Sequence, residues 1–381
     1  MKITYIIQSL LPTGGTERII TEKANYYADQ LGYEISVIKC IQTPDQPNAF
    51  KLSDKIQQIN LGIPYYSQYR YHYPKRFWIR RSIRKRIKKS VTQAIQQIDP
   101  DIVIGTACFN ADLICKINCR AKKIIECHEA RAFLEFELKP KKFFLSKFFV
   151  KLNKRKYFSA IERNADIVVT LTEKDKEQWK KAKQVEVIPN FSDMIVTGIS
   201  TCENKRVIAV GRLEWEKGYE RLLEAWKPIS LKHPDWRLDI YGDGSLENQL
   251  KEMIKTLEIG NTSICHATPH ISQEYANSSI CVMSSFFEGF ALVLLEALRH
   301  GVPCVAFDCP CGPGSIIKDK QCGFLVENHN NVLFVEKINE LIENEELRKS
   351  FSKAALKRAE AFNMNIIIQK WEKLFDQVLN S

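Results

Sequence analysis

Short apolar segments rich in valine and isoleucine alternate along the chain with longer segments whose apolar residues recur at helical spacing. A short, uninterrupted apolar run is typical of a strand that is buried on both faces of a parallel sheet. In the first half of the chain we expect strands at Ile3–Ser9, Ile35–Ile41, Ile102–Thr106, Lys123–Cys127, Ile167–Leu171 and Val185–Ile188. In the second half we expect them at Val207–Val210, Trp236–Tyr241, Ser263–His266, Ile280–Met283, Pro303–Phe307 and Gly323–Val326. Helical periodicity marks Thr16–Leu31, Arg76–Ile98 and Asn365–Leu379.

Two such series in succession predict an α/β protein with two Rossmann-like, doubly wound domains. At 381 residues the chain is too long for one ordinary core and suits two of similar size. A stretch rich in turn residues, 189–204 (PNFSDMIVTGISTCEN), separates the two series. We expect a first domain over 1–190, a second over 191–362, and a C-terminal helix over 363–381 that could pack back on the first. Ligands of open parallel sheets bind beyond the carboxyl ends of the strands, so we look for the chemistry there.

Positive charge is concentrated in the first half of the chain. Residues 1–190 contain 35 Lys and Arg against 19 Asp and Glu, and residues 191–381 contain 21 against 26, so the net charges are +16 and −5. Two stretches that interleave cations with aromatic rings supply most of the excess, Lys75–Lys89 and Lys139–Lys156. Such a surface suits anionic lipid headgroups, and solvated basic helices are the alternative. No recognition motif accompanies the charge, so we expect no nucleic-acid partner.

Composition argues against several other classes of protein. No run of about 18 uncharged apolar residues occurs, so no membrane span is expected. The N-terminus lacks a small-x-small cleavage site and is interpreted as a buried first strand. The twelve cysteines include no C-x-x-C pair and are expected to be reduced thiols, many of them in the core. Cys127-His128 and Cys309-Pro-Cys311 lack a second ligand pair at zinc spacing, so we expect no metal.

The strongest chemical signal is the segment 284–298 (SSFFEGFALVLLEAL), where a strand ends, Gly289 permits a tight turn and a helix begins. The unpaired N–H groups and the positive dipole at a helix start suit an anion such as a diphosphate. Glu288 and Glu296 lie eight residues apart, about two helical turns, so both carboxylates could face one cleft and accept hydrogen bonds from sugar hydroxyls. A capping Glu288 and a salt-bridging Glu296 are the alternative.

A second signal lies in 210–218 (VGRLEWEKG), where Arg212 follows a strand and Lys217 stands at the next helix entrance. Two cations at the carboxyl end of a strand can clamp a diphosphate, although surface cations are also common.

Two weaker signals lie in the first half of the chain. Gly14 and Gly15 follow the first strand and allow the backbone to approach a ligand closely at a helix N-terminus. Their loop has neither the G-x-G-x-x-G spacing of dinucleotide proteins nor the lysine of a P-loop, which argues against NAD and against ATP hydrolysis. His128 ends a strand and could bond a substrate hydroxyl, and a structural histidine is the alternative.

In their order along the chain, these motifs resemble glycosyltransferase family 4, a retaining family with the GT-B fold. The order is a Gly-Gly loop, a histidine at a strand end, Ile-Pro-Asn, G-R-x5-G, Tyr-Gly-Asp-Gly and E-x7-E, and it spans nearly the whole chain. The segment 311–317 (CGPGSII) is similar to the G-P-x-E-I-I segment of bacterial polysaccharide transferases, with Ser315 in place of the acidic residue. Phe191 and Ser192 follow Asn190 where the family more often has glycine.

The resemblance implies two domains that face each other across a cleft and a donor bound by the second. Arg212 and Lys217 would hold the donor diphosphate, helped by the turn and helix-start amides of Gly289, Phe290, Ala291 and Leu292. Glu288 would fix the hydroxyls of the donor sugar and Glu296 the ribose. Gly14 and Gly15 would approach the donor phosphate and the acceptor, and His128 would touch the donor sugar near the reacting carbon. The resemblance implies no metal, because the cations and the helix dipole take its place. It implies no cofactor either, because the nucleotide sugar is itself a substrate.

We therefore expect a retaining, metal-independent transferase of a hexose or N-acetylhexosamine, with a UDP-sugar favoured over a GDP-sugar. The acceptor would be a glycan, carried on a lipid, in surface polysaccharide synthesis. The basic first domain would bring the enzyme to the anionic cytoplasmic face of the plasma membrane as a peripheral protein. A GT-B epimerase or phosphorylase, or an inactive membrane-binding scaffold, is the alternative.

Overall fold

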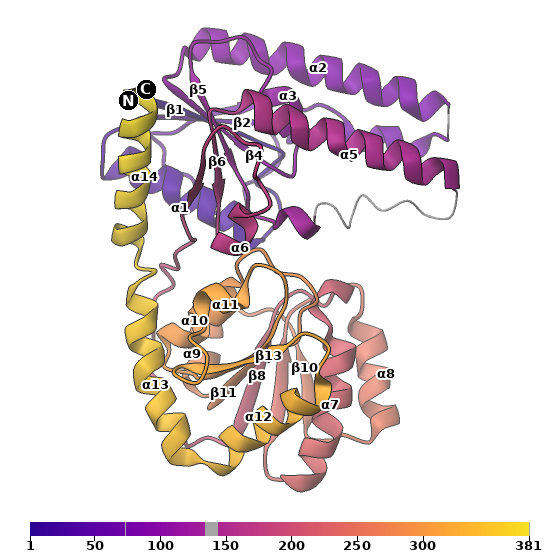
Figure 1. Ribbon diagram of the computed structural model, residues 1–381, viewed down its shortest axis with the longest axis vertical. Coiled ribbons are helices and arrows are strands. Elements are labelled where there is room, and N and C mark those ends of the chain that lie inside the picture. Colours follow the sequence, from indigo (N-terminus) through magenta and orange to yellow (C-terminus); the bar gives the residue numbers. More distant parts are fainter. Residues whose placement is uncertain (73, 134–143, 381) are drawn as a thin grey trace. The chain divides into compact units, whose positions relative to one another are not determined.

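The computed structural model describes residues 1–72, 74–133 and 144–380, which form two compact units (Figure 1). Unit 1 comprises Met1–Leu171, Asp175–Ile188 and Ile368–Ser381, and unit 2 comprises Thr172–Lys174 and Pro189–Ile367. Each unit contains a parallel sheet with helices between its strands. The expected class, an α/β protein with two Rossmann-like units, is confirmed.

Unit 1 contains a seven-stranded sheet in the order β3-β2-β1-β4-β5-β6-β7, with every neighbouring pair parallel. Its strands are β1 (Lys2–Ile7), β2 (Glu34–Lys39), β3 (Gln57–Asn60), β4 (Ile102–Thr106), β5 (Lys122–Glu126), β6 (Ile167–Thr170) and β7 (Val185–Val187). Its main helices are α1 (Gly15–Asp29), η1 (Tyr65–Arg70), α2 (Lys75–Ile98), α3 (Ala111–Ile114) and α5 (Phe144–Asn164). The short helix α6 (Glu173–Lys176) spans the division between the units.

Helix spacing explains how unit 1 buries its core. Ile83, Ile87 and Val91 recur every four residues along α2 and form one stripe against the sheet, although nine of the 24 residues of the helix are Lys or Arg. The last helix, α14 (Met364–Leu379), belongs to unit 1 from Ile368 onward. There Phe375 is buried and its ring meets that of Tyr27 edge to face, with centroids 5.6 Å apart.

Unit 2 contains a six-stranded parallel sheet in the order β10-β9-β8-β11-β12-β13. Its strands are β8 (Arg206–Val210), β9 (Arg237–Tyr241), β10 (Thr262–Cys265), β11 (Ile280–Met283), β12 (Cys304–Asp308) and β13 (Gly323–Glu327). Its helices are η2 (Trp215–Lys217), α7 (Tyr219–Lys232), α8 (Glu247–Leu257), α9 (Ile271–Ala276), α10 (Leu292–Arg299), α11 (Pro313–Ile316), α12 (Asn331–Glu343) and α13 (Glu345–Glu360). The fully buried Trp226 and the stacked rings of Phe307 and Phe334 lie in its core.

The strand order fixes where each unit can bind a ligand. In unit 1 the chain moves toward one edge of the sheet from β1 to β3 and toward the other edge from β4 onward. Unit 2 reverses in the same way between β8 and β11. Such a reversal opens a crevice at the carboxyl ends of the two central strands, because their following loops diverge to opposite faces.

Two local expectations were wrong. The edge strand β3 was missed, because its sequence QQIN is mostly polar and its residues are only partly covered. Helix α10 begins at Leu292, after Ala291 in a left-handed conformation with φ 64°. Glu288 therefore precedes the helix, so the two-turn helical spacing to Glu296 does not describe their relation.

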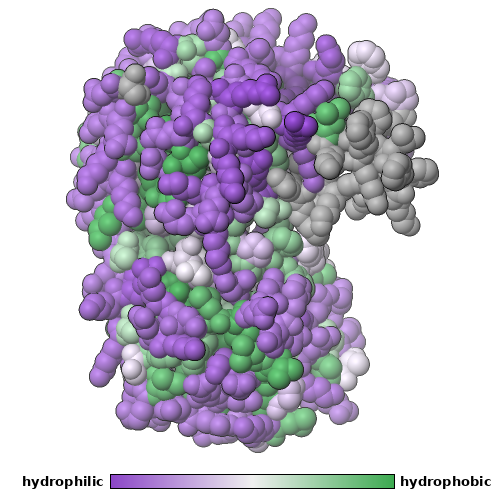
Figure 2. Space-filling view, viewed as in Figure 1, coloured by the Kyte–Doolittle hydropathy of each residue, from purple (hydrophilic) through white to green (hydrophobic). Residues whose placement is uncertain are grey.

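Hydrophilic side chains cover most of the face of the molecule shown in Figure 2. Within the described residues, no helix combines the length and apolar character that a bilayer crossing needs. The basic stretch Lys75–Lys89 lies on α2. Part of the stretch Lys139–Lys156 lies outside the described residues, and its remainder belongs to α5.

Candidate functional site

Two loops of unit 2 meet at the carboxyl ends of neighbouring strands. One follows β8 and carries Arg212 and Lys217, and the other follows β11 and carries Glu288. Backbone groups join them: the amide of Phe286 donates to the carbonyl of Glu216 at 2.8 Å. The Ser284 hydroxyl also donates to the Lys217 carbonyl at 3.0 Å. The two loops thus form one structure at the reversal of this sheet.

At the centre of these loops, Lys217 Nζ lies 2.8 Å from Glu288 Oε1. The Ser285 hydroxyl donates to the same oxygen at 2.6 Å. The lysine and glutamate side chains are only 20% and 9% exposed, so solvent screens the pair weakly. The contacts therefore fix Lys217 beside Glu288. The lysine can bind a phosphate and the carboxylate can accept from a hydroxyl.

Gly218 makes the close approach of the two loops possible. Its φ is 64°, and a Cβ at this position would lie 2.3 Å from the Ser284 carbonyl oxygen. A side chain would therefore clash with backbone that cannot move away cheaply. The glycine lets the Lys217 turn lie directly against the end of β11.

Arg212 stands apart from this pair. Its side chain is 71% exposed and donates to Glu216 Oε1 at 2.8 Å. The structure thus brings Lys217 together with Glu288, while Arg212 projects into solvent from the same loop. Glu216 was not predicted from the sequence. It links Arg212 to the loop after β11, because its side chain binds Arg212 and its carbonyl accepts from the Phe286 amide.

The segment after Glu288 runs into the start of α10. Glu288 forms an isolated parallel bridge with Cys311, so it is anchored to the loop after β12. Gly289, Phe290 and Ala291 then lead to Leu292, the first residue of the helix. Farther along, the carboxylate of Glu296 is buried and accepts from the Tyr275 hydroxyl at 3.3 Å.

In unit 1, the glycines and the histidine singled out from the sequence lie after different strands. Gly14 caps the N-terminus of α1 in an extended conformation, and Gly15 is the first helical residue. His128 follows β5, next to β4 at the reversal of this sheet. Its side chain is 2% exposed, and Nε2 lies 3.5 Å from Glu126 Oε1. Within the described residues neither ring nitrogen makes a hydrogen bond.

A buried ion pair adjoins His128. Lys23 of α1 donates to Glu126 Oε1, and both side chains are 1% exposed. Burial raises the pKa of Glu126, but electrostatic interactions with Lys23 first, and then with His128, outweigh it and lower that pKa to about 2. Burial lowers the pKa of Lys23, and Glu126 only partly offsets this. Glu126 is therefore ionised at neutral pH, with Lys23 as its hydrogen-bonding partner.

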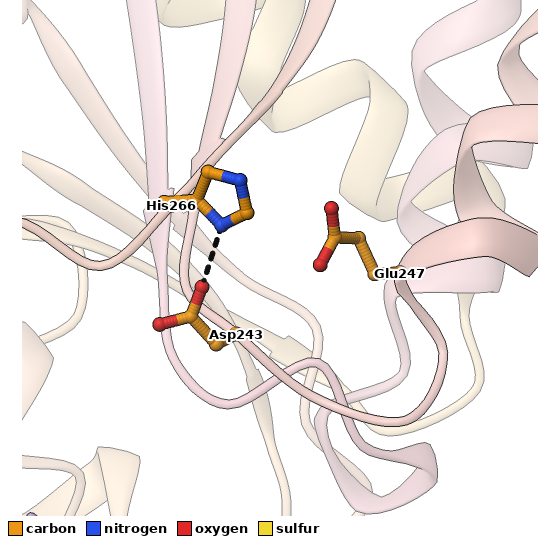
Figure 3. Close-up of side chains that lie close together, drawn as sticks. All are labelled: Asp243, Glu247 and His266. Carbon is orange, nitrogen blue, oxygen red and sulfur yellow. Dashed lines mark hydrogen bonds and ion pairs between the residues drawn. The ribbon is translucent and has the colours of Figure 1, made fainter.

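Three groups in unit 2 lie close enough to share a metal ion (Figure 3). They are Asp243 after β9, His266 after β10 and Glu247 at the start of α8. His266 Nδ1 and Asp243 Oδ1 are 2.8 Å apart and bond to each other, and these two side chains are 75% and 58% exposed. Glu247 pairs instead with Lys251 at 2.6 Å, and the expectation of metal independence stays a prediction.

All twelve cysteines are free thiols in the structure, nine of them buried. Burial raises the pKa of Cys40 and Cys115 to about 12 and that of Cys309 further still. Thiols of this kind remain protonated at neutral pH and are poor nucleophiles and metal ligands.

Known families and proteins match both units. Residues 13–194 match the model described as Glycosyltransferase Family 4, and residues 200–358 match that of the group 1 glycosyl transferases. A glycosyltransferase of Haemophilus influenzae that carries no assigned activity is 30% identical over 97% of this chain and 99% of its own. The amylovoran biosynthesis glycosyltransferase AmsD of Erwinia amylovora is 35% identical over 56% of this chain and 62% of its own. An N-acetylgalactosaminyltransferase of Campylobacter jejuni is 26% identical over all of both chains.

Solved structures agree with the fold. Sucrose-phosphate synthase of Thermosynechococcus elongatus covers all of both chains with a TM-score of 0.82 at 16% identity. TarM of S. aureus covers 98% of this chain and 99% of its own, with a TM-score of 0.74 at 16% identity. Together with the family models and the full-length relative, these likenesses show that the chain belongs to the glycosyltransferases of family 4, with the GT-B fold.

Proposed function

We propose that this glycosyltransferase transfers a hexose or N-acetylhexosamine, with retention and without a metal ion, from a nucleoside-diphosphate sugar. The observation that carries the proposal is the pairing of Lys217 with Glu288 at the reversal of the unit 2 sheet. The donor is a UDP-sugar in preference to a GDP-sugar. In support, TarM and HepE of Anabaena, two proteins with this fold, have been solved in complex with UDP.

The donor would use the groups of the two joined loops. On binding, the diphosphate would replace Glu288 as the partner of Lys217. The exposed Arg212 could exchange its ion pair with Glu216 for one with the same diphosphate. Glu288, released from the lysine but still bonded to Ser285, would accept hydrogen bonds from the sugar hydroxyls. The amides of the turn and helix start from Gly289 to Leu292 would stabilise negative charge on the departing diphosphate, and Glu296 would bind the ribose.

The reaction needs no protein base in this scheme. The acceptor hydroxyl attacks the anomeric carbon on the face from which the diphosphate departs, and a phosphate oxygen of that leaving group takes the hydroxyl proton. One glycosidic bond forms as the bond between the sugar and the diphosphate breaks, and the nucleoside diphosphate leaves with the proton of the acceptor. Lys217 acts most strongly as the diphosphate gains charge, so it stabilises the transition state more than the bound substrate.

We also propose that the acceptor is a lipid-linked glycan of bacterial surface polysaccharide synthesis, and that the enzyme works at the cytoplasmic face of the membrane. The Campylobacter jejuni relative is named for an undecaprenol-linked acceptor, and AmsD for amylovoran biosynthesis. At the start of α2, Phe77 and Trp78 are 46% and 65% exposed beside Arg80 and Arg81, which are also exposed. Exposed rings among cations are typical of a surface that meets anionic lipid.

A donor screen tests the activity. The purified protein is incubated with UDP- and GDP-sugars and a lipid-linked acceptor extract, products are detected by mass spectrometry, and their anomeric configuration is read by NMR, with and without EDTA. Lys217→Ala should lower turnover about 10²- to 10³-fold. The matched control Lys232→Ala removes an exposed lysine of α7 that pairs with Glu343, and turnover should be unchanged.

Each part of the proposal has its own contrary result. Equal rates for Lys217→Ala and the control would remove Lys217 from the site, and inverted products or loss of activity in EDTA would contradict the mechanism. A folded protein that binds neither UDP nor GDP by calorimetry would favour a scaffold. A bound pyridoxal chromophore, or conversion of the sugar nucleotide without acceptor, would favour a phosphorylase or an epimerase.

A further inference from the structure

Arg221, in the first turn of α7, donates hydrogen bonds from all three guanidinium nitrogens. Nε donates to the Ser284 carbonyl and Nη2 to the Ser285 carbonyl, both at 2.6 Å, and Nη1 donates to Asn328 Oδ1 at 2.9 Å. The residue is 7% exposed. Burial lowers its pKa to about 10, which leaves it charged at neutral pH.

Two aromatic rings enclose the same guanidinium. Its central carbon lies 4.1 Å from the ring centroids of both Phe286 and Phe307. Phe286 in turn stacks on Trp215, which begins η2, the short helix that ends with Lys217, with centroids 6.3 Å apart and planes 25° apart. The arginine thus touches the strand core through Phe307 and the site loops through Phe286.

From these contacts we propose that Arg221 is a positioning residue, which holds the loop after β11 so that Glu288 stays opposite Lys217 and the donor site is preformed. The inference rests on the proposed function and deepens it, because it names a residue that acts on the donor through the loop. The carbonyls of Ser284 and Ser285 lie just beyond the end of β11, and both residues are nearly fully buried.

The chemistry of the side chain explains why this position needs arginine. A guanidinium presents fixed donors in one plane, which match two successive carbonyls and an amide oxygen at once, and its flat faces stack on rings. A lysine at this position keeps the charge but can direct only one short-reaching ammonium at the three acceptors. At least one buried carbonyl would then be left unpaired, which favours a shifted loop.

The chain offers a matched control in the same unit. Arg348 of α13 is 4% exposed, and its guanidinium lies over the ring of Trp236. It donates from Nε to the Cys202 carbonyl at 3.0 Å and from Nη1 to those of Leu341 and Ile342 at 2.6 and 2.8 Å. These acceptors lie outside the two site loops, so Arg348→Lys should destabilise unit 2 without loosening them.

The experiment compares Arg221→Lys with Arg348→Lys by hydrogen exchange, thermal unfolding, UDP calorimetry and steady-state kinetics of the full chain. Both variants should unfold at lower temperature. Only Arg221→Lys should exchange faster in peptides covering 284–291 and 215–218, bind UDP more weakly, and lose about 10²-fold in kcat/KM. Asn328→Ala, which removes one acceptor and leaves the two carbonyl bonds, should move the same readouts in the same direction by less.

Unchanged exchange in 284–291, or kinetic losses that are equal in the two arginine variants, would overturn the inference. Asn328→Ala provides the decision if Arg221→Lys does not fold. A wild-type protein that binds no nucleotide would refute the proposed function, whereas hydrogen exchange would still show whether Arg221 holds the loop. The two failures are therefore distinguishable.

Discussion

Lys23→Met removes the cation from the buried pair of unit 1 and leaves the Glu126 carboxylate in a site where its side chain is 1% exposed. Removing one partner of a buried ion pair costs about 3–5 kcal/mol of unfolding free energy, because the remaining charge is not solvated and has lost its main partner. With a urea dependence of about 2 kcal/mol per molar, the unfolding midpoint of unit 1 should fall by about 2 M. Methionine fills much of the volume of the lysine stem, so lost packing contributes little.

The loss of unfolding free energy caused by Lys23→Met should depend on pH, because it depends on the charge of Glu126. In the wild type, the pKa of Glu126 is lowered to about 2, so its stabilisation is present above the unfolded value of 4.5 and is lost only as pH falls toward 2. In the variant, burial is opposed only by His128, so we expect the pKa of Glu126 to rise above the unfolded value. A raised pKa gives stability that is present at low pH and lost as pH rises, so the difference between variant and wild type should be smaller at pH 5 than at pH 7.

Urea unfolding at both pH values, followed by tryptophan fluorescence, measures the midpoints, and hydrogen exchange in β1 and β5 assigns the transition to unit 1. The matched control is Lys39→Met, since Lys39 is also buried but donates to the neutral oxygens of Asn48 and Gln58. It should cost about 1–3 kcal/mol with no such pH dependence. Changing both Lys23 and Glu126 to Met should recover most of the loss. Equal, pH-independent losses in the two lysine variants, with no recovery in the double variant, would refute the reasoning.

Two further predictions concern the turn before α7 and the basic helix of unit 1. Gly218→Ala should cost about 1–3 kcal/mol of unfolding free energy in urea and weaken UDP binding, because φ is 64° and the new Cβ would meet the Ser284 carbonyl. The control is Gly260→Ala, which has open space around its Cβ. Equal effects of the two substitutions would contradict the clash. Changing the exposed Arg81, Lys85, Lys88 and Lys89 of α2 to Gln should weaken the binding free energy to phosphatidylserine vesicles by about 1 kcal/mol per charge, measured by co-sedimentation, at unchanged UDP affinity. The control, Lys251→Gln with Lys255→Gln on α8, should not weaken it. Unchanged vesicle binding would refute the membrane proposal.

The sheets could be predicted from the sequence because their central strands are covered on both faces. A strand such as β4 (IVIGT) is buried at every position and is apolar up to its last residue, Thr106, so it is visible as a run. The edge strand β3 has no such constraint, since one side of it has no neighbouring strand. The start of α10 was also hidden, because Ala291 adopts a left-handed conformation that alanine seldom takes and no glycine or asparagine marks it.

The site was only partly predictable, because side-chain partners depend on the order of strands in the sheet. The motifs containing Lys217 and Glu288 were found at strand ends, but their direct contact depends on β8 lying beside β11, which chain order alone does not fix. The sequence suggested that Arg212 would act together with Lys217. In the structure Arg212 instead binds Glu216, four residues along the same turn, which local spacing could have indicated.

Lys23 and Arg221, which were not predicted from the sequence as important, each lie on the buried side of a helix. Lys23 stands on the buried stripe of α1 with Ile19, Ile20 and Tyr27, and Arg221 is buried among Tyr219, Leu222 and Leu223 in α7. A cation on such a face must find partners from elsewhere in the chain, since burying it alone is too costly. Those partners are 103 residues away for Lys23, in Glu126, and 63 and 64 residues away for Arg221, in the two serine carbonyls. A charge on an apolar stripe therefore predicts that a buried polar contact exists, while only the folded sheet shows which residue supplies it.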